Sequence, residues 1–379
     1  MTDASTGRRR LAATLEAAGA LDAQWRDAIL AVPRHLFLPD VYWATTTEYI
    51  KVDRTSTPHG WMGYAYQDVP IVTQWDNGAC TGEQVPTSSA SMPTMVATML
   101  RHLEVQPGGT VLEIGTGTGY NAGLLAHRLG GTNVVTVEVD PDVADQARKA
   151  LAEADLHPQV ITGDGAHGWP GDAPYDRVLA TCSVIDIPQA WIAQTRPGGI
   201  IVTPVGTLFG GGALAKLTVG PDGTASGPFV GSSAFMLLRQ QRYQAPPVDD
   251  YLPDEWPGDA GASLTSLDPE AIGDDWLAQF VIGLQLPDVY YRRTPNGDGW
   301  TWWLFDTGVT SWATVDSTPG DAEFDVRQSG PRRLWDEIET AYQWWTGAGR
   351  PSFERFGLTI DQDGGRPWLD RPGNPVRAR

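Results

Sequence analysis

The 379-residue chain has little cysteine, little basic charge and no long apolar run. Its two cysteines, Cys80 and Cys182, do not suggest a disulfide framework and fit a reducing cytoplasm. The net charge of -19 disfavours a nucleic-acid partner, because that affinity rests largely on Lys and Arg neutralising phosphates. No apolar run approaches the roughly 20 residues that a membrane helix needs, and the first ten residues lack a secretory pattern. We therefore expect a globular cytoplasmic protein that binds neither nucleic acid nor membranes.

The most informative segment is VLEIGTGTGY at 111–120, which is followed by VVTVEVD at 134–140. An apolar run, a glycine-rich turn and a second apolar stretch indicate a strand, a tight loop and a helix, the arrangement that lets backbone approach a nucleotide-like ligand. The glycines of the turn are Gly115, Gly117 and Gly119. A dinucleotide fingerprint has its third glycine at the sixth position of the motif, where this chain has Tyr120. The spacing favours S-adenosylmethionine over NAD.

Two acidic residues extend the predicted cofactor site. Glu138 ends the second strand, where a carboxylate can accept hydrogen bonds from both ribose hydroxyls. Asp164 lies in a Gly-Asp-Gly loop after a short apolar strand, where it can accept from the adenine amino group. Glu113 is predicted to be buried, either anchoring backbone N–H groups of the loop or touching the methionine end of the cofactor. The predicted cofactor-binding residues are Glu113, Gly115, Thr116, Gly117, Gly119, Glu138, Asp164 and Gly165, and no metal site is predicted.

Apolar strands alternate with helical stretches from residue 110 onward, which predicts an α/β Rossmann-like fold with a parallel sheet covered by helices on both faces. A Pro-Asp-Gly turn at 221–223 predicts a hairpin that closes the edge of this sheet. The chain length suggests two domains. The Pro-, Asp- and Gly-rich segment 245–263 has the composition of a linker, so we place the boundary between residues 1–245 and 246–379.

The segment 246–379 is predicted to be an α+β extension. It holds 10 of the 16 tryptophans, carries -12 of the net charge, and contains no His or Cys. Its aromatic side chains suit a core or a peptide groove better than metal or thiol chemistry. Residues 299–305 and 310–315 look like strands, and 331–345 like a helix. We expect the extension to recognise the substrate.

Several further motifs agree in order and spacing with those of one enzyme family. They are VPRHLFLP at 32–39, AYQDVP at 65–70, SMPTMVA at 91–97, VLEIGTGTGYNAGLLA at 111–126, GDGAHGWP at 163–170, YDRVLATCSVIDIP at 175–188 and RPGG at 196–199. Over about residues 10–240 the chain resembles the protein-L-isoaspartate O-methyltransferases. The resemblance implies that Ser91 lines the pocket for the substrate carboxylate, that Glu138 binds the ribose and that Asp164 lies by the adenine. The local sequence alone would make Ser91 a helix N-cap.

The chain departs from that family in two places. The short connection before the Ser-x-Pro helix is replaced by the longer segment 71–90. The extension past residue 246 is absent, by our expectation, from ordinary repair enzymes. With this extension the chain resembles the long variants that mature ribosomally made cyclic peptides such as lanthipeptides or graspetides. The resemblance implies a cyclised ribosomal peptide as partner.

The chemistry that this resemblance implies needs no general base, because an Asp side chain with a pKa near 3.9 is already ionised at neutral pH. His35 and His167 are accordingly given structural or rim positions. The leading hypothesis is methyl esterification of an Asp or isoAsp carboxylate in a modified ribosomal peptide, followed by closure to a succinimide (aspartimide). The alternative is general repair of isoaspartate in proteins. A third hypothesis is a protein that binds a peptide without turnover.

Overall fold

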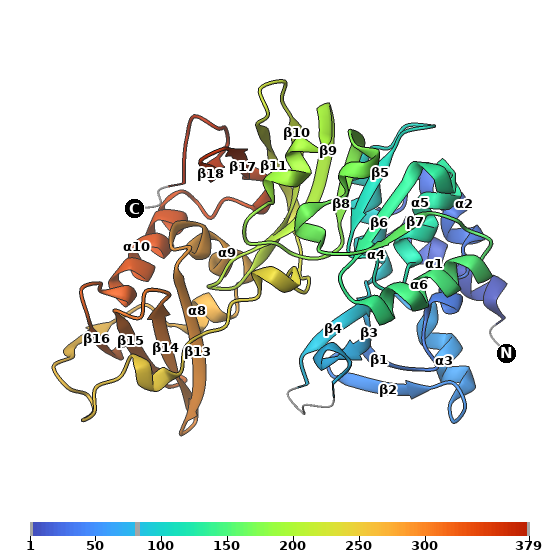
Figure 1. Ribbon diagram of the computed structural model, residues 1–379. Coiled ribbons are helices and arrows are strands. Elements are labelled where there is room, and N and C mark those ends of the chain that lie inside the picture. The colour runs from blue at the N-terminus through green and yellow to red at the C-terminus, as the bar shows by residue number, and fades with distance from the viewer. Residues whose placement is uncertain (1–2, 80–83, 377–379) are drawn as a thin grey trace.

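A nine-stranded sheet forms the centre of the computed structural model, which describes residues 3–79 and 84–376 (Figure 1). Its parallel part has the order β7-β6-β5-β8-β9. These strands are β5 (Val111–Ile114), β6 (Val134–Glu138), β7 (Gln159–Thr162), β8 (Tyr175–Ala180) and β9 (Thr195–Gly206). The chain order reverses on either side of β5, which places a topological switch point at the carboxyl end of that strand. The predicted Rossmann-like α/β fold is confirmed.

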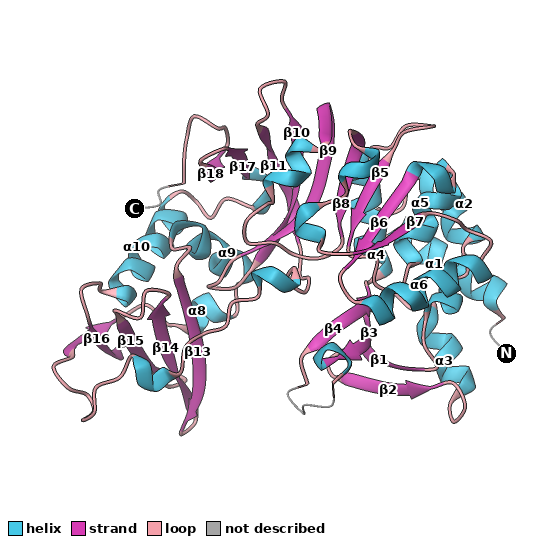
Figure 2. Cartoon of the chain, in the orientation of Figure 1, coloured by secondary structure: helices cyan, strands magenta, loops and turns pink. Residues whose placement is uncertain are grey.

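Helices cover both faces of this sheet, as the alternating pattern predicts (Figure 2). The α-helices in the described part of the first 200 residues are α1 (Ala4–Ala17), α2 (Ala23–Ala31), α3 (Pro58–Ala65), α4 (Pro93–Leu103), α5 (Tyr120–Leu129), α6 (Pro141–Glu153) and α7 (Gln189–Ala193). Apolar residues of α1, α2, α4 and α5 share one buried cluster with one face of the sheet. Helix α7 packs on the opposite face through Trp191, which is fully buried. No helix within the described residues is long and apolar enough to span a bilayer.

The antiparallel part of the sheet corrects one prediction. β10 (Gly212–Val219) and β11 (Ala225–Ser232) form the expected hairpin, but they do not close the sheet edge. β17 (Phe356–Asp361) pairs with β11, and β18 (Gly364–Leu369) follows it at the edge. The turn chemistry predicts the hairpin locally, whereas nothing local indicates a partner strand more than a hundred residues later. The last strands of the chain therefore complete the sheet that the first 245 residues begin.

Two smaller antiparallel sheets lie below the central sheet in the view of Figure 1, one at each end of it. The four-stranded sheet consists of β1 (Val41–Thr45), β2 (Tyr49–Asp53), β3 (Ile71–Trp75) and β4 (Pro86–Ala90) in the order β2-β1-β3-β4. The five-stranded sheet consists of β12 (Gly261–Thr265), β13 (Val289–Asn296), β14 (Gly299–Asp306), β15 (Trp312–Ser317) and β16 (Phe324–Ser329). Helices α8 (Glu270–Gly273), α9 (Trp276–Gln285) and α10 (Leu334–Gly347) belong to the same region. The strands predicted at 299–305 and 310–315 are confirmed. The helix predicted at 331–345 is α10, which begins at Leu334, three residues later than expected.

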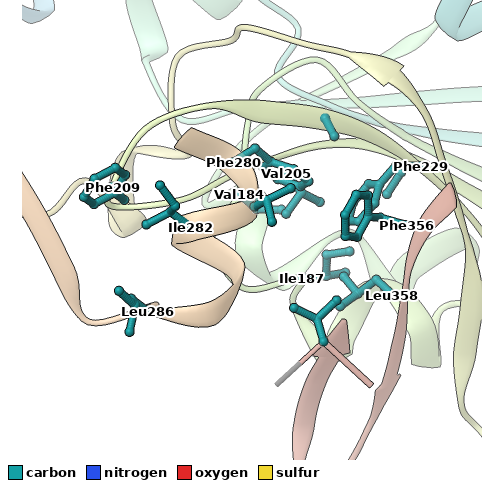
Figure 3. Packing of buried hydrophobic residues seen from close by; sticks show 14 of the residues in the cluster. Val184, Ile187, Val205, Phe209, Phe229, Phe280, Ile282, Leu286, Phe356 and Leu358 are labelled. Carbon is teal, nitrogen blue, oxygen red and sulfur yellow. The ribbon is translucent and has the colours of Figure 1, made fainter. Parts of the chain in front are cut away.

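The core of the C-terminal region is continuous with that of the central sheet. Figure 3 shows Phe280 of α9 in one apolar cluster with Phe229 of β11 and Phe356 of β17. The rings of Phe229 and Phe280 meet edge-on with centroids 5.1 Å apart, and neither side chain is exposed. Segment 245–263, which has the composition of a linker, is also folded, because Tyr251 packs on Phe305 with ring centroids 4.6 Å apart. The division at residue 245 stays a prediction, although the segments before and after it share the central sheet and one apolar core.

Candidate active site

The glycine-rich turn between β5 and α5 forms one wall of the site. Gly115, Gly117 and Gly119 have φ values of 90°, 53° and 89°, a left-handed backbone that favours glycine. A Cβ on Gly117 would lie 3.3 Å from the carbonyl oxygen of Ser89, and one on Gly119 would lie 3.2 Å from Cβ of Ala147. The three glycines therefore give the turn its shape and let β4 and α6 approach it closely.

Glu138 ends β6 directly beside this turn. Its Oε2 accepts a hydrogen bond from the backbone N–H of Gly117 at 2.9 Å, and its Oε1 accepts from the N–H of Asp140 at 3.1 Å. Only 8% of the residue is exposed, and burial raises the pKa of its carboxyl above the ordinary value. The two backbone donors fix the carboxylate at the wall of the cavity, where the sequence predicts a ribose-binding acid.

Glu113 lies one layer behind the cavity and is fully buried. Its oxygens accept from Nδ2 of Asn121 and from Oγ1 of Thr136, each at 2.6 Å, and Oγ1 of Thr136 lies 2.7 Å from Oγ1 of Thr116. Burial raises the pKa of Glu113 to about 7. Asn121 and Thr116 line the cavity, whereas Glu113 does not. Glu113 thus holds Asn121 directly and Thr116 through Thr136, rather than backbone N–H groups of the loop. The alternative, contact with the methionine end of the cofactor, stays a prediction.

The Gly-Asp-Gly loop after β7 contributes its second glycine to the cavity. Gly165 is part of the lining, and a Cβ there would lie 2.6 Å from Cγ2 of Ile114. Asp164 is not part of the lining, and its Oδ1 accepts from the backbone N–H of Ala166 at 2.8 Å, which caps a short turn. Contact of Asp164 with the adenine stays a prediction.

Ser91 lines the cavity from the segment between β4 and α4. It is not the N-cap that the local sequence suggests, because α4 begins at Pro93 and Met92 occupies the cap position. The N-terminus of the helix is satisfied instead by Asp68, whose carboxylate accepts from the N–H of Thr94 at 2.8 Å and from its hydroxyl at 2.5 Å. The N-cap expectation was wrong because a carboxylate 26 residues upstream takes that role.

The backbone of this segment is held by Arg34, which is fully buried. Its guanidinium donates to the carbonyl oxygens of Ser91 at 3.1 Å, of Ala90 at 3.4 Å and of Ala65 at 3.0 Å. One rigid cation thus joins the strand that enters the site to the helix α3 that precedes it in the chain. Neighbouring His35 lies 2.7 Å from the hydroxyl of Tyr66, and burial lowers the pKa of the imidazole.

These elements enclose a cavity of about 980 Å³, including its mouth. One wall is the turn 115–118, and a second is the segment 87–91, which belongs to the connection where the chain departs from the resembled family. A third wall is the segment 235–242, which sequence reasoning missed. Hydrogen bonds of Ser183 with the backbone of Met236 and Leu238, at 2.8 and 2.7 Å, bring it there. No local pattern in the sequence signals this pairing.

Cys182 also lines the cavity, and burial raises the pKa of its thiol to about 12. A thiol with so high a pKa stays neutral at physiological pH, so it supplies no thiolate nucleophile. Cys80, the other cysteine, lies outside the described residues. His167 is exposed, which agrees with a rim position. Within residues 3–79 and 84–376, no group of three or more His, Cys, Asp and Glu side chains could hold a metal.

The cavity fits a nucleoside cofactor, because the glycine turn and the carboxylate of Glu138 that is bonded to it line the cavity together at the switch point of the sheet. A family model described as protein-L-isoaspartate(D-aspartate) O-methyltransferase matches residues 7–218, more than half of the chain. The chain belongs to this family. It is therefore an S-adenosylmethionine-dependent carboxyl O-methyltransferase.

Two curated proteins named protein-L-isoaspartate O-methyltransferase illustrate the similarity. The methyltransferase is 38% identical to that of Methanoculleus marisnigri over 193 residues, which cover 51% of this chain and 73% of the relative. It is 35% identical to that of Methylorubrum extorquens over 239 residues, which cover 62% of this chain and 90% of the relative. Both alignments leave more than a third of this chain unaligned.

A solved structure with the same protein name extends the comparison to the C-terminal region. It is 22% identical in sequence, has a TM-score of 0.55, and covers 96% of this chain and 100% of its own. At this identity the likeness concerns the fold alone. Because the alignment spans nearly the whole chain, the methyltransferase's extension has a counterpart in a protein of that name. The expectation that ordinary repair enzymes lack such an extension stays a prediction.

Proposed function

We propose that this methyltransferase esterifies the free carboxylate of isoaspartyl residues in proteins and peptides. The observation that carries the proposal is the common cavity of Ser91 and Glu138, the residues predicted for substrate and cofactor. The names of the curated relatives, and an extension with a counterpart in a structure of the same name, favour repair over a peptide-specific role.

When bound, S-adenosylmethionine would supply an electrophilic methyl group to a carboxylate oxygen of the substrate, with S-adenosylhomocysteine as the leaving group. For this step the chain needs to bind, orient and exclude water, because the acceptor carboxylate is already ionised at neutral pH. Glu138 and the turn at Gly117 hold the nucleoside side. The hydroxyl of Ser91 donates to the acceptor carboxylate, and Arg34 and Asp68 keep the Ser91 segment in place through its backbone and the helix that follows.

The ester that results reacts further without the enzyme. The following backbone amide nitrogen attacks the ester carbonyl and expels methanol, which gives a succinimide. Hydrolysis of that ring returns part of the material as ordinary aspartate. A repair cycle therefore needs only the methyl transfer from this chain.

The proposal is tested with two synthetic peptides that differ only in one residue, isoAsp or L-Asp, and with radiolabelled methyl donor. We expect methyl transfer to the isoAsp peptide and little transfer to the L-Asp peptide. Transfer to the L-Asp peptide alone, or to neither peptide when the protein demonstrably binds S-adenosylhomocysteine, contradicts the proposal.

A second candidate is methylation of an Asp in a cyclised ribosomal peptide, with the succinimide as product. Two features support it: the unusual connection 71–90 contributes a wall of the cavity, and the C-terminal region exposes aromatic side chains, including Trp256 at 49% and Trp300 at 39%. We propose that the C-terminal region contributes to substrate choice in either case. The same assay with a side-chain-bridged peptide, read by mass spectrometry for loss of water, separates the two functions. A bridged Asp peptide that turns over faster than the isoAsp peptide favours the second.

A further inference from the structure

The third wall of the cavity, segment 235–242, is firmly fixed. Besides the contacts of Leu238 with Ser183, the side chain of Gln241 accepts from the N–H of Ile185 at 2.7 Å and donates to the carbonyl of Asp186 at 2.6 Å. Two arginines on this wall, Arg239 and Arg242, are the cationic residues in the cavity lining. Because the backbone between them is tied to the loop after β8, both have well-defined positions.

The two arginines differ in what they bind. Arg239 forms an ion pair with Asp140 at 3.3 Å, and Asp140 also accepts from the side chain of Gln74 at 3.2 Å. Arg242 has no hydrogen-bond or ion-pair partner for its guanidinium among the described residues. It is nevertheless partly buried, and burial lowers the pKa of its guanidinium. A partly buried cation without a protein partner has lost part of its solvation, and an anionic ligand in the cavity can replace it.

The chemistry of such a ligand follows from the side chain. A guanidinium presents a planar fork of N–H donors that matches a carboxylate, and an Arg–carboxylate hydrogen bond is stronger than a neutral one. The protein carries a net charge of -19, so an anionic peptide is repelled by most of its surface. An unpaired arginine at the cavity provides a local site of opposite sign.

Both the peptide and the cofactor carry a carboxylate that Arg242 could bind. The position of Arg242 in the cavity wall favours the peptide. Arg239 lies against Asp140, two residues from the ribose-side Glu138. Arg242 is three residues farther along and precedes Tyr243, whose ring lies 5.3 Å from that of Tyr290 in the five-stranded sheet. We propose that Arg242 binds a carboxylate of the acceptor peptide, an inference that rests on the proposed function.

Two carboxylates of the peptide have the required chemistry, the acceptor itself and that of a neighbouring acidic residue. The acceptor loses its charge as the methyl group arrives, so a contact with it stabilises bound substrate more than the transition state. A neighbouring carboxylate keeps its charge throughout. Loss of a contact with the neighbouring carboxylate should raise the peptide KM and leave kcat unchanged, whereas loss of a contact with the acceptor should raise both KM and kcat.

The test compares Arg242→Gln with Arg10→Gln, a change of an exposed arginine on α1 that alters the charge equally. Two isoAsp peptides are used, with Glu or Gln beside the isoAsp. We expect Arg242→Gln to raise the peptide KM about 10-fold, the effect of one charged hydrogen bond, and Arg10→Gln to leave it unchanged. A rise for both peptides assigns the acceptor carboxylate, and a rise for the Glu peptide alone assigns its neighbour.

Ionic strength provides a readout that a merely structural role would not move. Added salt should raise the wild-type peptide KM and have a smaller effect on Arg242→Gln, because a partly exposed ion pair is screened. The inference is overturned if peptide KM is the same in both variants, or if Arg242→Gln weakens S-adenosylhomocysteine binding while sparing peptide KM. If the wild-type enzyme methylates neither isoAsp peptide, the proposed function fails instead.

Discussion

The carboxylate of Glu138 accepts a hydrogen bond from the backbone N–H of Gly117 at 2.9 Å, across 21 positions of sequence. The acid at the end of β6 therefore fixes the turn that follows β5, and it does so before any ligand arrives. The residue expected to bind the ribose and the loop expected to approach the nucleoside form one preorganised unit. A change at Glu138 should accordingly affect cofactor binding in two ways, by direct contact and through the loop.

Replacing Glu138 with Ala should weaken binding of S-adenosylhomocysteine by about 1.5–3 kcal/mol, the range for hydrogen bonds to a charged group. Titration calorimetry measures the effect. Asp142→Asn, an exposed acid on α6 nearby, is the matched control and should bind as the wild type does. Unchanged affinity in Glu138→Ala would remove this residue from the ribose site.

Glu113 should make stability depend on pH. Its pKa is raised from 4.5 to about 7 by burial, so the folded protein binds the proton more tightly than the unfolded chain does. Its contribution to the free energy of unfolding is then complete below pH 4.5, falls as pH rises towards about 7, and is constant above. In Glu113→Gln this decline should be smaller by about 1–3 kcal/mol between pH 5 and 8. Urea denaturation at both pH values tests it; equal declines in both proteins would contradict the burial argument.

Substitutions of Ser91 and Asp68 should separate the contribution of this segment to activity from its contribution to stability. Ser91→Ala should slow methylation roughly 10- to 100-fold, because a hydrogen bond to a carboxylate is lost, and should leave thermal stability unchanged. Asp68→Ala should cost about 1–2 kcal/mol of stability, because it caps α4. Full activity of Ser91→Ala together with reduced stability would return Ser91 to a structural role.

The C-terminal region should be required for folding as well as for substrate choice. A truncation to residues 1–245 removes β17 from β11 and uncovers Phe229, so we expect no soluble monomer. Within the full chain, Phe280→Ala should destabilise by about 3–5 kcal/mol, whereas Leu264→Ala, at a site 60% exposed, should stay within about 0.5 kcal/mol. A soluble truncation that binds S-adenosylhomocysteine normally would contradict the shared core.

The wild type and both single variants should each unfold in one cooperative transition, since one apolar cluster includes Ile114 of the catalytic sheet and Trp302 of β14. Two separate transitions by calorimetry would support the division at residue 245 that the linker-like composition suggests.

The sequence by itself determined the parts of this protein that depend on contiguous patterns. The turn at 115–119 needs glycine for its backbone angles, and the neighbouring strands β5 and β6 are recognisable as largely apolar runs, so the fold and the cofactor class follow from a short segment. The same holds for the hairpin at 221–223 and for the helix that begins at Pro93.

Tertiary structure alone decided which distant residues meet. Asp68 caps a helix 26 positions away, Arg34 binds the backbone of the Ser91 segment, and Arg242 reaches the cavity because its wall pairs with the loop at Ser183. The pairing of β17 with β11 is of the same kind. Hydrogen bonds of this sort depend on positions in space and leave no periodic trace in the sequence, since each involves a backbone group that any residue possesses or a single side chain that has no neighbour in the pattern.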